Sequence, residues 1–144
     1  MSSEPKGPGR RRAGDPVRRA AKRAIDIAVS ALALVLLSPL FGVIALLVVL
    51  DSRGPVFFRA DRIGFRGRPL RMLKFRKMRS GARGVALTVA GDERLTRLGA
   101  WLVRTKLDEL PQLWNVLRGD MSFVGPRPEV PEYVDLDNPM WADV

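Results

Sequence analysis

The stretch IAVSALALVLLSPLFGVIALLVVL runs from Ile27 to Leu50 and contains no charged residue over 24 positions. At about 1.5 Å per residue, a helix of this length reaches across a hydrocarbon core of roughly 30 Å. The alternative is a wholly buried core helix, but the rest of this 144-residue chain has too little apolar sequence to surround one. The stretch therefore predicts a membrane segment.

Two features of this segment argue against a straight spanning helix. Ser38 and Pro39 lie at its middle, where a proline removes a backbone hydrogen bond and bends the helix. Both flanks are basic, so the positive-inside rule keeps both ends cytoplasmic. We expect a re-entrant helix hairpin with its break at Ser38 and Pro39. An ordinary kinked transmembrane helix stays open on these residues, because spanning helices tolerate proline.

The charge on either side of this segment is strongly basic. The net charge is +10, and residues 1–23 carry eight Lys and Arg against two acids, while residues 53–80 carry ten against one. Residues 107–144 reverse the balance, with two against eight. A phosphorylated substrate, an anionic membrane or another polyanion is the partner class that this charge favours. Nucleic acid is not expected, because the chain has no recognised nucleic-acid-binding motif.

The chain contains no cysteine and no histidine. Disulfides, thiolate metal sites and a cysteine nucleophile are therefore excluded, and the usual base at neutral pH is missing as well. Any catalysis must use carboxylates, Lys, Arg, Ser or Thr.

The composition divides the chain into three segments. Residues 1–21 are rich in Pro, Gly, Ser and Arg and predict a disordered basic arm that touches anionic membrane lipid. Residues 22–52 form the membrane helix, and residues 53–144 form a cytoplasmic domain. Asp26, near the start of the membrane helix, is expected to pair with Lys22 or Arg23.

The cytoplasmic segment predicts an α/β fold that is mostly helical with a small β-element. Two short strands are expected at residues 56–60 and 70–75, joined by a turn rich in Gly and Arg. Leucines at helical spacing predict a helix over residues 93–104. A second helix is expected over residues 109–118, with Asp108 as its N-cap and a stop at Gly119.

The sequence LDELPQLWN places Asp108 and Glu109 side by side just before a proline. Local rules favour a capping role for both acids, and catalysis is the alternative. A helix N-terminus can bind phosphate. Arg104 lies near the acid pair in sequence and Arg127 lies between two prolines, and arginine is a cation that binds phosphate. A carboxylate can attack a phosphoryl group to give an acyl phosphate, and hard oxygen ligands favour Mg²⁺.

Together these stretches resemble a known family. The kinked apolar segment is followed by GPVFFRADRIGFRGRPLRMLKFRKMRS at 54–80 and TKLDELPQLWNVLRGDMSFVGPRPE at 105–129. From about residue 22 to residue 133 the chain is similar to the bacterial sugar transferases, which are small monotopic phosphoglycosyl transferases. The resemblance implies transfer of a sugar-1-phosphate from a UDP-sugar to undecaprenyl phosphate, with release of UMP. It places this reaction at the cytoplasmic face of the bacterial inner membrane, as the first membrane step of exopolysaccharide, O-antigen or other glycan biosynthesis.

The resemblance also assigns residues to roles. Asp108 falls on the family's nucleophile, which takes up the phosphosugar covalently, and Glu109 falls on the second acid, beside the metal and the phosphates. Mg²⁺ is the implied cofactor, with these two acids as its ligands. Ser38 and Pro39 match the break of the family's re-entrant helix. Four basic positions are suited to nucleotide and lipid phosphates: Lys74, Arg76, Arg104 and Arg127.

The chain departs from the family pattern in two places. Lys77 stands in FRKM where the family commonly has Thr or Ser. Family members also continue well beyond PRPE through a Pro-Gly-(Ile/Leu)-Thr segment, whereas this chain ends at Val144, so we expect a catalytic domain that is incomplete at its C-terminus. The alternative to an active transferase is an inactive relative that serves as a membrane-bound interaction or scaffold protein. The transferred sugar and a homo-oligomeric state are left open by the sequence.

Overall fold

The computed structural model describes residues 16–64, 67–79, 81, 92–125 and 127–134. Most of the predicted basic arm and the last ten residues of the chain lie outside these ranges. The described part is mostly helical and contains a small two-stranded sheet, as the sequence predicted.

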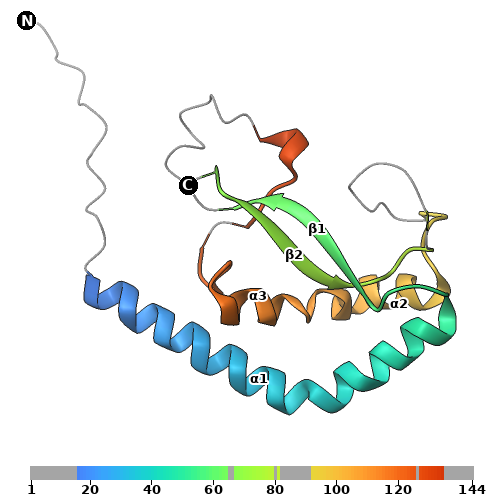
Figure 1. Cartoon of the computed structure of the whole chain (residues 1–144), viewed down its shortest axis with the longest axis horizontal. Coiled ribbons are helices and arrows are strands. Elements are labelled where there is room, and N and C mark those ends of the chain that lie inside the picture. Colours follow the sequence, from blue (N-terminus) through green and yellow to red (C-terminus); the bar gives the residue numbers. More distant parts are fainter. Residues whose placement is uncertain (1–15, 65–66, 80, 82–91, 126, 135–144) are drawn as a thin grey trace, which may run out of the picture.

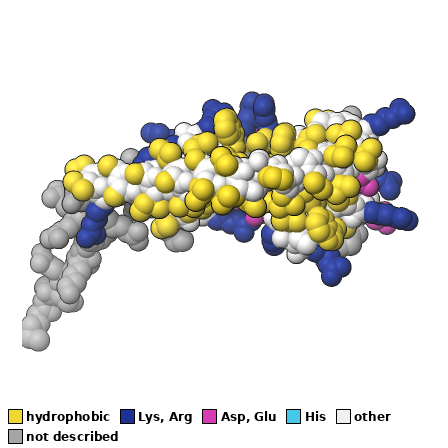
Figure 2. Space-filling view, turned by 90° about the horizontal axis from the view of Figure 1, so that it is seen from below, with side chains coloured by type: hydrophobic (Ala, Val, Ile, Leu, Met, Phe, Trp, Pro, Cys, Tyr) yellow, Lys and Arg dark blue, Asp and Glu magenta, His cyan; other side chains and the backbone are white. Residues whose placement is uncertain are grey.

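The apolar stretch lies within one long helix, α1, which runs from Pro16 to Asp51. Because α1 begins before residue 22, residues 16–21 are helical and do not belong to a disordered arm. By length and composition, α1 is the one helix in the described ranges that is apolar enough to cross a membrane. Its large apolar side chains are mostly exposed, and Figure 2 shows them spread along the face of α1 that points away from the rest of the protein.

The predicted break at Ser38 and Pro39 is a bend, because α1 continues through it without interruption (Figure 1). Pro39 has no N–H to offer the carbonyl of Val35, four residues earlier. The Ser38 hydroxyl donates to that carbonyl instead, at 2.8 Å. The serine thus satisfies the backbone oxygen that the proline leaves without its helical partner, which allows the helix to bend inside an apolar stretch.

The first half of α1 is attached to a short helix, α3 (Gln112–Arg118). Arg23 donates to the carbonyls of Val116 and Leu117, both at 2.6 Å, and so satisfies oxygens at the end of α3. Asp26 is buried and accepts a hydrogen bond from the backbone N–H of Phe123 at 3.3 Å. The predicted pairing of Asp26 with Lys22 or Arg23 is therefore wrong. Arg23 and Asp26 each bind backbone groups of a segment that is distant in sequence.

The second half of α1 contributes to the hydrophobic core. Ile44 and Val48 pack with Phe75 and Leu102, all four almost fully buried. The ring of Phe41 lies 5.4 Å from that of Phe75, at a tilted angle that suits aromatic pairs. The second half of α1 thus packs into the core, whereas the first half is attached through Arg23 and Asp26.

The hairpin consists of β1 (Phe57–Ile63) and β2 (Pro69–Phe75), which pair antiparallel. Both strands lie close to the predicted ranges, and β1 is longer. Asn115 of α3 covers the other edge of β2: its Oδ1 accepts from the N–H of Leu73 at 2.9 Å, and its Nδ2 donates to the carbonyl of Arg71 at 2.8 Å. This amide takes the place of a third strand at a sheet edge that would otherwise lack partners.

Between the hairpin and α3 lie two further elements. Helix α2 (Arg97–Thr105) starts where the Thr96 hydroxyl accepts from the N–H of Gly99, which is why it begins later than predicted. Lys106 then adopts a left-handed conformation with φ of 61°, and the 3₁₀ helix η2 (Leu107–Glu109) follows. A second 3₁₀ helix, η3, follows α3 in the chain and spans Pro131–Tyr133.

The predicted helix over residues 109–118 is divided in two. Pro111 has no N–H to donate, and it separates η2 from α3, whose N-cap it forms without a side-chain hydrogen bond. Asp108 therefore lies inside η2, and its prediction as a helix N-cap is wrong. The predicted stop at Gly119 is confirmed, with a left-handed φ of 95°. Figure 1 shows the resulting layers, with α1 beneath α2 and α3, and the hairpin above them.

Candidate active site

The acid pair lies in η2, where successive side chains point about 120° apart because a 3₁₀ helix has three residues per turn. Asp108 and Glu109 therefore face different surroundings although they are neighbours in sequence. The Asp108 side chain is only 4% exposed, whereas that of Glu109 is 27% exposed.

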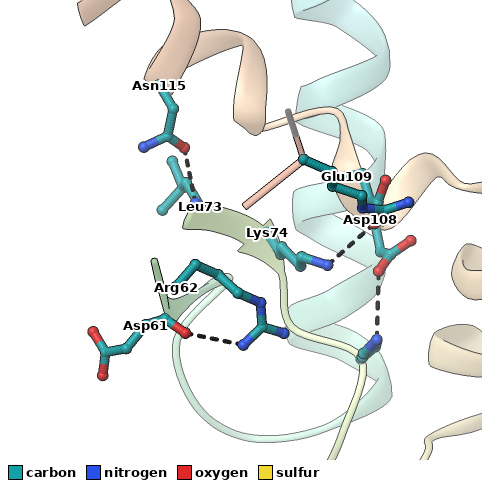
Figure 3. Close-up of polar contacts among 9 residues, drawn as sticks. Asp61, Arg62, Leu73, Lys74, Asp108, Glu109 and Asn115 are labelled. Carbon is teal, nitrogen blue, oxygen red and sulfur yellow. Dashed lines mark hydrogen bonds and ion pairs between the residues drawn. The ribbon is translucent and has the colours of Figure 1, made fainter. Parts of the chain in front are cut away.

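Glu109 is held by two cations. Its Oε1 accepts from Nζ of Lys74 and from Nη2 of Arg127, each at 3.1 Å. Figure 3 shows Lys74 pointing from β2 toward Glu109, with Asp108 beside it. Burial would raise the pKa of Glu109, but the positive charges of Lys74 and then Arg127 outweigh it and hold that pKa below its ordinary value. All three residues were predicted site residues, and the structure brings them together.

Asp108 faces a cation that was not among the predicted site residues. The Nζ of Lys77 lies 3.6 Å from Oδ2 of Asp108, and the Lys77 side chain is only 17% exposed. Burial lowers the pKa of Lys77 below its ordinary value, and the charge of Asp108 opposes this shift only in part. The available signal was the spacing of Lys74 and Lys77, but a regular strand would have placed them on opposite faces.

Both lysines reach the acid pair because the chain leaves the sheet between them. Strand β2 ends at Phe75, and Lys77 follows it on a segment that α2 holds. The N–H of Thr96 donates to the Lys77 carbonyl at 3.0 Å. Gly99 packs against the same carbonyl so closely that an added Cβ would lie 1.9 Å from its oxygen. The start of α2 therefore fixes the backbone that carries Lys77.

The other two predicted phosphate-binding residues lie elsewhere. Arg76 is buried and donates to carbonyls at the end of α1, those of Val48, Ser52 and Arg53. Arg104 is exposed in the last turn of α2, and within the described ranges no hydrogen bond or ion pair joins it to either acid. Contact of these two arginines with substrate phosphate stays a prediction.

The site carries a net positive charge. Lys74, Lys77 and Arg127 contribute three positive charges against the two of Asp108 and Glu109. Phosphate oxygens are attracted to such a site, and a carboxylate inside it can approach a phosphate without the full repulsion of like charges.

The predicted Mg²⁺ can be compared with these ligands. In the part of the chain that the structure describes, no cluster of three or more acidic side chains is present. Mg²⁺ does not require one, since it often binds one or two carboxylates together with substrate phosphates and water. Glu109 suits this arrangement, because its side chain is partly exposed and both of its cation contacts use Oε1. Glu109 therefore fits a metal that arrives with a diphosphate.

A separate groove of about 960 Å³ lies along the hairpin and α3, and the acid pair does not line it. Its lining is strongly basic and includes one half-exposed tryptophan, with these residues among others: Arg59, Arg62, Arg68, Arg71, Trp114 and Arg118. The buried Asp108 and its neighbouring lysines thus lie outside this groove.

Comparison with known families matches residues 17–142 to the family described as bacterial sugar transferase. This range contains the hairpin, the acid pair with Lys74, Lys77 and Arg127, and all of α1 except its first residue. The chain belongs to the bacterial sugar transferase family. The resemblance seen in the sequence is thereby confirmed.

Curated relatives in this family are similar over most of the chain. The undecaprenyl-phosphate glucose phosphotransferase of Komagataeibacter xylinus is 49% identical over 114 residues, which cover 77% of the chain and 21% of that protein. The UDP-glucose:undecaprenyl-phosphate glucose-1-phosphate transferase of Escherichia coli (strain K12) is 50% identical over 114 residues, 78% of the chain and 25% of the relative. The Caulobacter vibrioides protein of the same name is 45% identical over 130 residues, 86% of the chain and 49% of the relative. The chain thus spans about a fifth to a half of the length of these relatives.

Proposed function

We propose that this member of the bacterial sugar transferase family transfers a sugar-1-phosphate from a UDP-sugar to undecaprenyl phosphate and releases UMP. Relatives that are 45–50% identical carry names that describe this reaction with UDP-glucose. The observation that carries the proposal is Asp108, a buried carboxylate beside Lys77 and next to the Glu109, Lys74 and Arg127 cluster. Formation of a polyprenyl-linked sugar for exopolysaccharide, O-antigen or another glycan is the proposed purpose.

The proposed reaction has two displacement steps at one phosphorus atom. A carboxylate oxygen of Asp108 attacks the phosphorus that bears the sugar, and the bond from this phosphorus to the bridging oxygen breaks, so UMP leaves with the electron pair. The result is an aspartyl phosphosugar. An oxygen of undecaprenyl phosphate then attacks the same phosphorus, which restores the Asp108 carboxylate and gives the lipid diphosphate sugar.

The remaining residues of the site act on charge and position. Lys74 and Arg127 hold Glu109 and offer their other N–H groups to the diphosphate. Glu109 would hold Mg²⁺ together with the substrate, and the ion would neutralise charge on the diphosphate. We assign exposed Arg104 to incoming nucleotide or lipid phosphate. Arg76 holds the end of α1 through the carbonyls there, and its contact with substrate phosphate stays a prediction.

We further propose that α1 enters the membrane and returns to the same side. Its first half is tied to α3 through Arg23, and its last turn is tied to Arg76 after β2. Both ends of the apolar stretch thus contact one compact unit, whereas a spanning helix would place them on opposite sides of the bilayer. This arrangement supports a site at the headgroup level of the cytoplasmic face of the inner membrane, where undecaprenyl phosphate arrives by lateral diffusion.

Radiolabel transfer tests the proposed reaction. Membranes that contain the chain are incubated with UDP-[¹⁴C]glucose and undecaprenyl phosphate, and organic-soluble label is counted. We expect label with the wild type and none above background with Asp108→Asn. Failure of the wild type with glucose, N-acetylglucosamine, N-acetylgalactosamine and galactose donors alike would remove the enzyme proposal and favour the scaffold alternative.

Cysteine labelling tests the proposed topology, since the chain has no natural cysteine. Single cysteines replace Ala20 and Asp51, which are exposed near the two ends of α1. In spheroplasts, a re-entrant helix leaves both cysteines unlabelled by an impermeant maleimide until the membrane is opened. Labelling of one cysteine alone in intact spheroplasts would indicate a spanning helix.

A further inference from the structure

The two acids of the site use their oxygens differently. Glu109 meets both of its cations through Oε1, and its side chain is partly open to solvent. Asp108 is almost fully buried, and its Oδ2 lies against the ammonium of Lys77. A hydrated divalent ion can therefore approach Glu109, whereas a positive charge already lies against one oxygen of Asp108.

Lys77 is held firmly in this position. Its carbonyl accepts from the Thr96 N–H, and Gly99 leaves no room for the backbone to shift toward α2. Its side chain is mostly buried, and moving it off Asp108 would leave two buried charges without each other, which is costly. The contact is therefore a fixed part of the site and is unlike a mobile surface ion pair.

We propose that Lys77 is a positioning residue that takes the place of a divalent cation at Asp108. Its ammonium binds Oδ2 and repels a metal ion from this carboxylate, so that the metal is left to Glu109 and the diphosphate. Oδ1 of Asp108 then stays available to attack phosphorus. This inference rests on the proposed function for the role of the two acids.

The chemical reason lies in the charge of the competing partners. A divalent ion on the nucleophile would draw electron density from both oxygens, whereas one ammonium at 3.6 Å orients the carboxylate and screens its charge without a coordination bond. An ammonium and a dication beside the same carboxylate also repel one another strongly at such distances. Lys77 and a metal at Asp108 therefore exclude each other.

Mn²⁺ binding, followed by the electron paramagnetic resonance signal of the free ion, tests the proposal on the full chain in detergent micelles without donor or acceptor. Lys77→Met removes the charge and keeps the length of the side chain. We expect it to bind Mn²⁺ about tenfold more tightly than the wild type, because a neighbouring positive charge is lost. Lys77→Arg keeps the charge and should restore the wild-type affinity.

Lys106→Met is the matched control, since Lys106 is exposed and lies two residues before Asp108. Its Mn²⁺ affinity should stay within about twofold of the wild type, as expected for an exposed charge. In the double variant Lys77→Met, Asp108→Asn the tighter binding should disappear. Circular dichroism reports whether each variant is folded, and Lys77→Gln replaces Lys77→Met if that variant is not.

Two results would overturn the proposal: a neutral residue at position 77 that leaves Mn²⁺ affinity unchanged, or tighter binding that persists without the Asp108 carboxylate. Neither result depends on turnover. A chain that fails to transfer sugar but shows the predicted Mn²⁺ affinities would contradict the proposed function and leave the role of Lys77 standing. A chain that transfers sugar but shows no change in Mn²⁺ affinity would support the proposed function and contradict the role of Lys77.

Discussion

Asp108 and Glu109 are adjacent residues with nearly the same chemistry and very different surroundings. Asp108 is buried against Lys77, on a backbone segment that α2 holds in place. Glu109 is partly exposed and shares one oxygen between Lys74 and the exposed Arg127. The site thus has a closed half at Asp108 and an open half at Glu109.

This difference shows how one short helix turn places two adjacent acids in different surroundings. Successive residues of a 3₁₀ helix point about 120° apart, so the pair can place one acid in the protein interior and the other toward solvent. A nucleophile gains from a fixed position, and a metal or phosphate ligand gains from access. The following predictions test whether the closed and open halves have these separate roles.

The largest expected difference is between the two acids themselves. Asp108→Asn should lower sugar transfer at least about 10³-fold, since removal of a nucleophile leaves only binding and electrostatic effects. Glu109→Gln should lower it about 10²-fold and still give slow transfer, because charge neutralisation is lost but the nucleophile remains. Initial rates with labelled UDP-sugar measure both. Equal losses from the two substitutions would contradict separate roles.

A substitution at Gly99 tests the closed half, because Gly99 packs against the backbone of Lys77. In Gly99→Ala the new Cβ would lie 1.9 Å from the Lys77 carbonyl oxygen, so α2 and the Lys77 segment must move apart. We expect the free energy of unfolding to fall by about 1–3 kcal/mol, as in other overpacked positions, and transfer to fall with it. Thermal unfolding in detergent measures the change.

Gly42→Ala serves as the control for this substitution. Gly42 lies within α1, and an added Cβ there meets no atom within 4 Å. Stability should therefore be unchanged or slightly higher, because alanine favours a helix. If Gly99→Ala is as stable as Gly42→Ala, α2 does not fix the Lys77 backbone.

A smaller effect is expected from the open half at Arg127. The Arg127 side chain is 72% exposed, so its ion pair with Glu109 adds little stability. Arg127→Met should leave the unfolding temperature unchanged and raise KM for the UDP-sugar about tenfold, because one charge-assisted phosphate contact is lost. Arg97→Met, at an exposed position of α2, should change neither quantity. A stability loss without a KM change would assign Arg127 a structural role.

The smallest expected effect concerns Asp92 and Arg94, which lie just before α2. Hydrogen bonds from the Arg94 side chain lower the pKa of Asp92 from 3.8 to about 2. Because the folded-state pKa is lowered, this contribution is full above pH 3.8 and disappears as the pH falls through about 2. The difference in unfolding temperature between the wild type and Asp92→Asn should therefore shrink between pH 5 and pH 2. A constant difference over this range would contradict the shift.

Much of the fold follows from local sequence signals. The uncharged run, the strand at residues 70–75 and the Gly119 stop are each predicted from neighbouring residues, and each lies close to its predicted position. The split of the helix over 109–118 was missed, although Pro111 was visible. Proline is tolerated in a first helical turn, and the sequence alone did not show that Lys106 begins a 3₁₀ turn before it.

The site was predicted only where family motifs named its residues. Lys74, Glu109 and Arg127 come from three separated segments, and the resemblance, not any local rule, grouped them. Lys77 and Arg76 show the limit of this approach. Lys77 binds Asp108, whereas Arg76 binds the end of α1, and this difference depends on where β2 ends and which residues pack against the following segment. Such tertiary contacts leave no periodic signal in the sequence.

The most direct test of this account captures the covalent intermediate. The chain is incubated with labelled UDP-sugar and without undecaprenyl phosphate, then treated with hydroxylamine, which converts an aspartyl phosphate to a hydroxamate. We predict donor-dependent modification of Asp108 in the tryptic peptide Leu107–Arg118, present in Glu109→Gln and absent in Asp108→Asn. Modification at Glu109, or sugar transfer that continues in Asp108→Asn, would contradict the assignment of Asp108 as the nucleophile.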